Sequence, residues 1–377
     1  MRDVIEKNLY LNNSLRCVAL SKYNKKVQDF IDRAAKIDSI MDFCEFKDFI
    51  KEFKKVYSGG IFSIKKAYSE SLLYGHINEV FHYAELDEKD FLYFPIMEHG
   101  IQFYMQIKKN HQSRIFQGEY FMEDWNKAYP GTPTFAIGPY VHYARPYYSE
   151  TEFNKIKEEI GKTLLVFPTH SYELGETHYN AEDFVDYVMQ EQAKDYQTVM
   201  VCAYWADLDH EIYRLFEARG AKIVSAGFRG DYNFIRRLRT IIELSDGVVA
   251  NSLGTFVGYC IYFKKPVVMV DGKIIKQLND LNLTNEMSGN MDKIEQLFYK
   301  EFSPTSKPFS KEQIELCEKY WGLSNVKSPE EIRAILQLNK KVIKKALGNV
   351  YEMGKAANTL KAENKFSELE KRVLEGR

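Results

Sequence analysis

The sequence predicts an α/β protein with two α/β halves and a C-terminal helical segment, and three observations support this prediction. The chain has 377 residues, which at roughly 150 residues per domain is enough for two or three domains. Over residues 163–271, apolar runs of strand length alternate with stretches of helical spacing, as expected for a doubly wound parallel sheet. The end of the chain is helical in pattern. We therefore predict domains at 1–150, 151–305 and 306–377.

The first half has the weaker pattern. Residues 24–57 are predicted to be mostly helical, because Ala34, Ile37 and Ile40 follow the pair Phe30 and Ile31 at intervals of three or four residues. Residues 91–100 and 133–144 are predicted as short β-rich runs that are closed by Gly or Pro. The segment 144–162 resembles a hinge leading into a short helix, with Ser149 as its N-cap and Gly161 past its end.

The second half alternates regularly between strands and helices. We expect strands at 163–171, 197–205, 221–227, 246–251 and 266–271, and helices at 181–195, 210–220, 231–245 and 252–265. Sheets of this kind bind ligands at the carboxyl ends of their strands.

The C-terminal segment carries a helix start signal at Ser328, Pro329 and Glu331, which combine a cap, an N1 proline and a capping-box acid. The apolar stripe after it is predicted to pack on the domains; its members are Ile332, Ile335, Leu336, Ile343, Leu347 and Val350. From Lys340 to Arg377 ten Lys or Arg stand against five Glu. This excess indicates either a solvated helical face or peripheral contact with an anionic membrane surface.

Composition excludes several classes of protein. Hydrophobic residues make up 45% and charged residues 28% of the chain, and the net charge is -1, so neither disorder nor broad nucleic-acid binding is expected. The five cysteines form no CxxC pair, and no signal-peptide core or membrane-spanning run is found. We expect a cytoplasmic protein. The chain also has no HExxH, GxGxxG or GxxxxGK[ST] motif, which disfavours zinc hydrolases, P-loop NTPases and NAD dehydrogenases.

The turn after the strand 246–251 is the strongest local signal. It contains Asn251, Ser252, Gly254 and Thr255 and leads into a helix. Backbone N–H groups and the dipole at a helix N-terminus attract anions, and Gly254 allows close approach, so a phosphate could bind here. An ordinary capped βα turn is the alternative.

Residues 163–271 resemble the C-terminal domain of bacterial GT-B-type glycosyltransferases of capsule and surface-polysaccharide biosynthesis, with related patterns in CDP-glycerol glycerophosphotransferase-like proteins. Ser252, Gly254 and Thr255 match the turn of that family, and Lys265, Pro266 and Val267 match the strand start after its helix. The resemblance implies two Rossmann-like domains that face a cleft. It also implies a nucleotide-sugar donor on the second half, a glycan or lipid-linked acceptor on the first, and no resident cofactor or metal.

Donor-binding candidates follow other predicted strands. His170 and Ser171 end the strand at 163–171, and Arg229 follows the strand at 221–227, where a guanidinium can neutralise a leaving phosphate. Tyr204 can stack a base or sugar. A structural His170 and a core-edge Tyr204 are the alternatives. We expect Arg236, Arg237 and Arg239 on a solvated or interdomain face.

Candidates for the base and the acceptor site lie in the first half. Glu98 and His99 end the run at 91–100, and a His-Gly pair at this place resembles transferases that use activated donors. Either side chain can serve as the base that takes the acceptor proton, and a buried, hydrogen-bonded His is the alternative. His142 and Arg145 are predicted to bind the acceptor. Asp207 and Asp209 resemble a DxD metal motif but are predicted as an N-cap and first turn.

These residues predict a glycosyltransferase that moves a sugar from a nucleotide-activated donor to a bacterial surface glycan such as capsule or lipopolysaccharide. A CDP-glycerol-type phosphotransferase and a nucleotide-sugar epimerase or hydrolase share the architecture and stay open. A nucleotide-sugar-binding subunit without catalytic activity is a further alternative.

Overall fold

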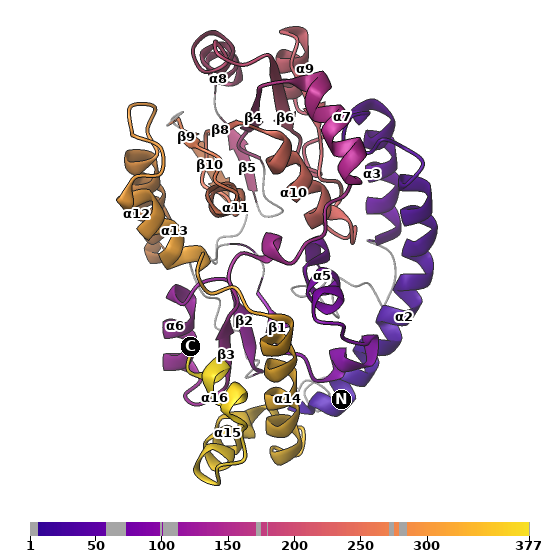
Figure 1. Cartoon of the computed structure of the whole chain (residues 1–377), viewed down its shortest axis with the longest axis vertical. Coiled ribbons are helices and arrows are strands. Elements are labelled where there is room, and N and C mark those ends of the chain that lie inside the picture. Colours follow the sequence, from indigo (N-terminus) through magenta and orange to yellow (C-terminus); the bar gives the residue numbers. More distant parts are fainter. Residues whose placement is uncertain are drawn as a thin grey trace. The chain divides into compact units, whose positions relative to one another are not determined.

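The structure is a computed structural model that describes residues 7–57, 73–98, 100, 112–170, 175–178, 180–270, 275–278 and 285–376. The chain forms two compact units (Figure 1). The first contains Met1–Asp29, Lys55–Ala144 and Glu318–Arg377, and the second contains Phe30–Lys54 and Arg145–Cys317. The predicted domains are continuous in sequence, whereas each observed unit is assembled from separate segments.

A five-stranded parallel sheet forms the centre of the second unit. Its strands are β4 (Thr163–Phe167), β6 (Thr198–Cys202), β7 (Lys222–Val224), β8 (Gly247–Ala250) and β9 (Val267–Met269). Their order across the sheet is β7-β6-β4-β8-β9. The central strand β4 is buried along its whole length, which explains why its sequence is continuously apolar. The prediction of a doubly wound parallel sheet over residues 163–271 is confirmed.

Helices connect and flank this sheet. Ser149 is the N-cap of α7, as predicted, and it also forms a capping box with Glu152. The helices of the unit are α3 (Phe43–Tyr57), α7 (Glu150–Ile160), α8 (Ala181–Tyr187), α9 (Glu211–Ala218), α10 (Phe234–Leu244), α11 (Phe256–Tyr262), α12 (Asn285–Glu301) and α13 (Lys311–Trp321), with a π-helical turn at Val188–Gln192. The last residues of α3 and α13 belong to the first unit. An antiparallel pair, β5 (Gly175–His178) with β10 (Ile275–Leu278), was not predicted.

The first unit contains a parallel sheet of the order β1-β2-β3, formed by β1 (Ile96–Met97), β2 (Arg114–Phe116) and β3 (Thr134–Ala136). Both α6 and α16 pack against β3. The helices of this unit are α2 (Leu9–Ala34, whose last turns belong to the second unit), α5 (His76–Tyr83), α6 (Tyr120–Ala128), α14 (Pro329–Lys345), α15 (Met353–Ala362) and α16 (Glu368–Leu374), with 3-10 turns at Leu73–Gly75, Glu88–Leu92, Tyr140–His142 and Val350–Glu352. Among the described residues, no helix combines the length and apolar composition needed to cross a membrane.

The helix start at Ser328 is confirmed, because its side chain and that of Glu331 form a capping box at the start of α14. The apolar stripe is buried at Ile332, Ile335 and Val350 but not at Leu347, which is 81% exposed. The helix ends at Lys345, and Leu347 adopts a left-handed backbone with φ of 52°. The prediction that Leu347 packs inward is therefore wrong, because the helical spacing stops two residues before it.

Candidate functional site

The carboxyl ends of β4 and β8 define the candidate site of the second unit. From β4 the chain builds outward through β6 and β7, and it then returns to the other side of β4 with β8 and β9. The direction of winding therefore changes between β4 and β8. In open α/β sheets such a switch point leaves a crevice outside the strand ends, which is where ligands bind.

Asn251 and Thr169 connect the two loops at this switch point. Asn251 follows β8 directly and is fully buried. Its Oδ1 accepts hydrogen bonds from the Thr169 backbone N–H at 2.6 Å and from the Thr169 hydroxyl at 3.0 Å. Since a backbone N–H can only donate, these bonds fix which amide atom is the oxygen.

The amide nitrogen of Asn251 takes no part in these hydrogen bonds. This atom, Nδ2, is buried and has no hydrogen-bond partner among the described residues. An unpaired buried donor costs about 1–3 kcal/mol, so a group of this kind needs an explanation. An oxygen atom of a bound ligand at the switch point would satisfy it.

Two side chains of α12 hold the turn after Asn251. The Tyr299 hydroxyl donates to the Asn251 carbonyl oxygen at 2.8 Å, and the Leu253 backbone N–H donates to Glu295 Oε1 at 3.2 Å. The Leu253 N–H is therefore already used, and a carboxylate lies beside the turn. Both facts reduce the capacity of the turn itself to bind a phosphate.

The helix after the turn also differs from the expectation. It starts at Phe256 rather than at Ser252, it has seven residues, and Thr255 at its N-cap makes no side-chain cap bond. A Cβ on Gly254 would lie 2.6 Å from the Phe256 ring, and this ring stacks on Phe167 with centroids 4.1 Å apart. Close packing of Phe256 therefore accounts for Gly254 without a ligand, while Ser252 is buried in the turn.

Aromatic and cationic side chains from neighbouring strand ends form the rest of the site. His170, after β4, stacks on Tyr204, after β6, with centroids 3.7 Å apart and an interplanar angle of 17°. Next to Tyr204 lies Trp205, whose ring has the Arg229 guanidinium carbon at 4.8 Å and Lys54 Nζ at 5.2 Å from its centroid. The structure therefore brings together His170, Tyr204 and Arg229 as a connected group through Trp205. Ser171 lies outside the described residues.

The lysine of the matched motif lies at the opposite edge of the sheet. Lys265 precedes β9 and donates to the carbonyl oxygens of Glu243 at 2.9 Å and Ser245 at 2.5 Å. Burial lowers the pKa of Lys265, while Asp246 acts in the opposite direction. These bonds join the end of α10 to the amino ends of the strands, so Lys265 has a structural role away from the switch point.

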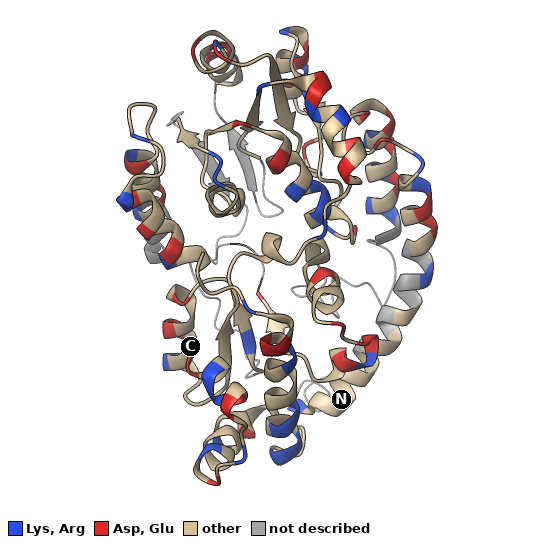
Figure 2. Cartoon of the chain, viewed as in Figure 1, with Lys and Arg blue, Asp and Glu red and all other residues tan. Residues whose placement is uncertain are grey.

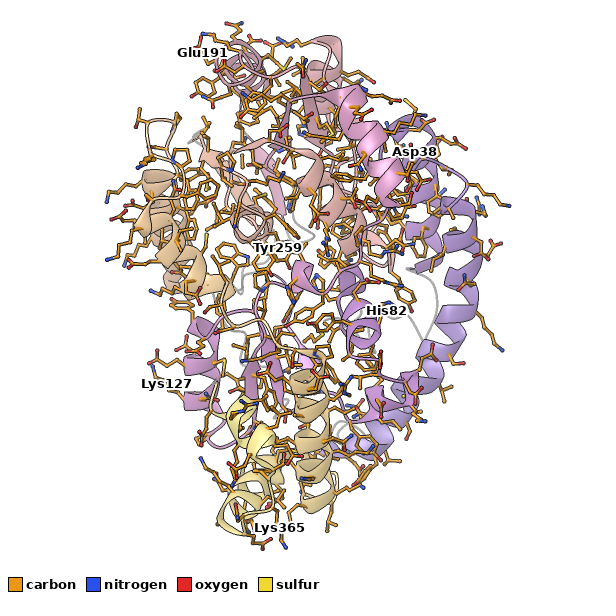
Figure 3. All side chains as sticks on the ribbon, in the orientation of Figure 1. Asp38, His82, Lys127, Glu191, Tyr259 and Lys365 are labelled. Carbon is orange, nitrogen blue, oxygen red and sulfur yellow. The ribbon has the colours of Figure 1, made fainter. Side chains whose placement is uncertain are left out.

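The three arginines on α10 were predicted on a solvated or interdomain face, and Arg237 is not solvated. It is fully buried, and its Nη1 pairs with Asp231 at 2.7 Å while its Nε donates to Ser39 at 2.8 Å. Asp38, labelled in Figure 3, accepts a hydrogen bond from the Tyr148 hydroxyl. These contacts fix the 30–54 segment within the second unit.

The predicted cap at Asp207 and Asp209 is wrong. The N-cap of α9 is His210, whose Nδ1 accepts from the Ile212 N–H at 3.2 Å. Asp209 instead pairs with Lys47 at 2.7 Å and Lys51 at 2.8 Å. Within the described ranges, no group of three His, Cys, Asp or Glu residues is placed to hold a metal.

In the first unit, Glu98 follows β1 and is buried. Its Oε1 pairs with Arg114 Nη1 at 2.9 Å, and the Arg114 guanidinium lies over the Trp125 ring. Gln117, which follows β2, is also buried, and neither of its amide atoms has a partner among the described residues. Gln117 was not predictable from the sequence, since a lone glutamine belongs to no motif.

The other predicted residues of the first half do not all belong to the first unit. His142 is half-buried and meets Tyr83 and Tyr143 edge to face, in the first unit. Arg145 is exposed and belongs to the second unit. His99 lies outside the described residues.

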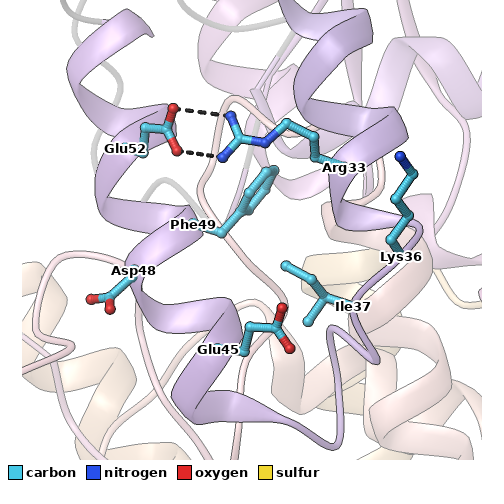
Figure 4. Close-up of a pocket in the computed structure, with 7 residues that line it drawn as sticks. All are labelled: Arg33, Lys36, Ile37, Glu45, Asp48, Phe49 and Glu52. Carbon is cyan, nitrogen blue, oxygen red and sulfur yellow. Dashed lines mark hydrogen bonds and ion pairs between the residues drawn. The ribbon is translucent and has the colours of Figure 1, made fainter.

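A surface pocket of about 380 Å³ lies between the end of α2 and α3 (Figure 4). Its lining has both signs of charge, and Arg33 and Glu52 form a two-bond ion pair across it at 3.0 and 2.6 Å. None of the predicted site residues lines this pocket.

No known protein family matches the sequence, and no curated protein matches it. Among solved structures, the chain is similar to a crystal structure of Anabaena Alr3699/HepE in complex with UDP-glucose, with 11% sequence identity and a TM-score of 0.27. The similarity covers 70% of this chain and 63% of the length of that chain. A TM-score this low establishes no shared fold, so the proposals below rest on the residues themselves.

Proposed function

We propose that the chain is a glycosyltransferase of the GT-B type, which transfers a sugar from a nucleotide-activated donor to a glycan or lipid-linked acceptor of the bacterial surface. The donor would bind at the switch point of the second unit. The observation that carries this proposal is the fully buried Asn251 side chain, whose Nδ2 has no partner among the described residues. This N–H group can donate a hydrogen bond to an oxygen-rich ligand, and ligands bind at the strand ends of a doubly wound sheet.

The neighbouring side chains match the parts of a nucleotide. Tyr204 supplies aromatic surface for a base or sugar ring, and the buried Trp205 packs against it. His170 and Arg229 supply hydrogen-bond donors that can stabilise the charge developing on a leaving phosphate. Because these side chains come from three different strand ends and are linked by ring contacts, a single ligand could contact them together. We propose that they compensate the phosphate charge without a metal ion.

In the turn after β8, we propose that side chains rather than backbone N–H groups contact the ligand. The Leu253 N–H is bonded to Glu295, so we assign ligand contact to the Asn251 amide and to the hydroxyls of Ser252 and Thr255. Glu295 itself is an acceptor for ligand hydroxyl groups, which a ribose or sugar carries.

For the acceptor side, we propose Glu98 or His99 as the base and His142 and Arg145 as binding residues. A base must take the proton of the acceptor hydroxyl as the donor bond breaks. The ion pair of Glu98 with Arg114 must open or shift for Glu98 to do this. Gln117 is added as a residue that can bind acceptor hydroxyls.

The proposal is tested by incubating the purified chain with a panel of nucleotide-sugars and measuring nucleotide release and sugar transfer, with and without EDTA. We expect release with one nucleotide class, unaffected by EDTA. The variant Ser252→Ala with Thr255→Ala should weaken donor binding. Unchanged donor affinity in this variant would remove the turn from the site, and the absence of release with every donor would count against an enzyme that acts without a partner.

A further inference from the structure

Helix α2 exposes an apolar stripe to solvent. Leu11, Leu15 and Val18 are 49%, 48% and 56% exposed. Their spacing of four and three residues places them on one face of the helix. The opposite face is the buried one, where Leu9 and Asn13 lie. A helix that buries one face and still shows three large apolar residues on the other has a face without a partner among the described residues.

The turn after α14 continues this apolar surface. Leu347 is 81% and Tyr351 is 49% exposed. The turn adjoins the start of α2, because the Leu9 N–H donates to the Gly348 carbonyl oxygen at 2.7 Å, and a Cβ on Gly348 would lie 2.5 Å from the Tyr10 ring. Both elements belong to the first unit, so they form one surface. We call it the α2/α14 patch, formed by Tyr10, Leu11, Leu15, Val18, Leu347 and Tyr351.

The sequence around the α2/α14 patch is rich in basic residues, although the exposed Glu352 directly follows Tyr351. Residues 7–26 hold five Lys or Arg and no Asp or Glu, and residues 332–351 also hold five and none. The C-terminal turns of α14 are accordingly blue in Figure 2. Lys341 and Lys345 pair with Glu370 and Glu363 from later helices, whereas Lys25 and Lys344 are exposed. The patch therefore combines exposed apolar side chains with nearby exposed lysines, Lys25 and Lys344.

We propose that the α2/α14 patch binds the surface of an anionic lipid bilayer. Helices with an exposed apolar face and basic flanks lie in the membrane interface, with the apolar side chains at the boundary between head groups and acyl chains. Each Lys or Arg near an anionic surface adds about 1 kcal/mol of attraction. Leu347, on a turn rather than within a helix, can enter this boundary alone. This inference goes beyond the proposed function and does not depend on it.

A second copy of the chain fits the patch less well. In a symmetric dimer the same surface meets itself, so two stretches without acidic residues would face their own copies. Like charges placed opposite one another in an interface cost free energy. An anionic bilayer offers the opposite charge to the lysines of both stretches. The inference also moves the expected membrane contact from the C-terminal helices in general to α2 and the turn at Leu347.

The test is co-sedimentation of the full chain with phosphatidylcholine vesicles that contain or lack phosphatidylglycerol, at low and high salt. We expect binding to the anionic vesicles, weakened by salt. The variant Leu11→Ser, Leu15→Ser, Leu347→Ser should bind about tenfold more weakly or worse, because the apolar area is lost. The matched control is Leu297→Ser with Phe309→Ser, which changes two apolar residues of the second unit that are 39% exposed.

A second variant, Lys25→Glu with Lys344→Glu, keeps the test valid if the serine variant does not fold, since both lysines are exposed. It should also bind about tenfold more weakly, while the control variant binds as the original chain does. Failure of the original chain to bind anionic vesicles would overturn the inference. The inference would also be overturned if both patch variants bound anionic vesicles as tightly as the original chain does. Self-association of the original chain that the serine variant loses, without vesicle binding, would assign the patch to a second copy instead.

Discussion

Asn251 Oδ1 accepts two hydrogen bonds from Thr169, one from the backbone N–H and one from the hydroxyl. The two residues follow adjacent parallel strands, β8 and β4, at the point where the sheet changes its direction of winding. This relationship orients the Asn251 amide so that its oxygen joins the two loops, while its Nδ2 is buried without a partner among the described residues.

Replacing Asn251 by Asp tests the free half of this amide. The substitution keeps an oxygen that can accept from Thr169 and replaces the Nδ2 donor by a second acceptor. We expect nucleotide affinity to fall about tenfold or more, because the second carboxylate oxygen of Asp would face an oxygen of the ligand with no proton between them. Titration calorimetry measures this. Thr169→Val is the control: it should lower the free energy of unfolding by about 1 kcal/mol and leave affinity nearly unchanged. Equal affinities of Asn251→Asp and the original chain would contradict the assignment.

The variant Lys265→Met tests whether Lys265 binds a ligand, as its place in the family motif implies, or stabilises the fold, as its hydrogen bonds indicate. Lys265 belongs to the motif of the resembled family, yet its ammonium group bonds the carbonyl oxygens of Glu243 and Ser245. The variant should lose about 1–3 kcal/mol in the free energy of unfolding, since these oxygens lose their donor. Nucleotide affinity measured at a temperature where the variant is folded should stay the same. A loss of affinity with unchanged stability would place Lys265 in the ligand site instead.

Glu98→Gln tests the buried ion pair of the first unit. The side chains of Glu98 and Arg114 are 8% and 2% exposed, so removing one charge leaves the other buried and uncompensated. The expected loss in the free energy of unfolding is about 3–5 kcal/mol. In Glu98→Leu with Arg114→Met, which removes both charges, most of the stability should return. Urea denaturation gives both values, and a Glu98→Gln variant as stable as the original chain would show that the pair contributes little.

The contact of α3 with Asp209 predicts a pH dependence. Hydrogen bonds from Lys47 and Lys51 lower the pKa of Asp209 from 3.8 to about 2. Because folding lowers this pKa, the stabilisation is full above pH about 4 and is lost as the pH falls toward 2. Asp209 is 67% exposed, so the contribution is about 0.5 kcal/mol and decreases with salt.

The measurement compares the unfolding midpoint in urea of the original chain with that of Asp209→Asn. Their difference should be constant above pH about 4 and should shrink below it. A difference that stays constant down to pH about 2 would show that Asp209 is not the titrating group.

The five strands of the parallel sheet in the second unit were predictable because each is a short apolar run bounded by turn residues. The helix starts at Ser149 and Ser328 were predictable because capping boxes are local in sequence. By contrast, the buried pair Arg237–Asp231 depends on the 30–54 segment, which supplies Ser39. No local sequence pattern indicates such a contact, so the sequence predicted only that the arginine lies on a solvated or interdomain face.

The candidate site also has a part that was predictable from the sequence and a part that was not. Placing His170, Tyr204 and Asn251 at strand ends followed from the order of strands and helices. The support of the turn by Glu295 and Tyr299 did not, because α12 is distant in sequence and its two side chains show only ordinary helical spacing. The exposure of Leu347 was missed for another reason: the apolar spacing continues where the helix has already ended.

The central claim is tested most directly by nucleotide binding to the switch point of the second unit. The measurement is a thermal-shift titration of the original chain and of Asn251→Asp against UDP, GDP, CMP, CDP and TDP and their sugar conjugates, because a ligand of the folded state raises the unfolding temperature. We predict a concentration-dependent rise with one nucleotide class that Asn251→Asp loses and Lys265→Met retains. No rise with any nucleotide, or an equal rise in Asn251→Asp, would contradict the account.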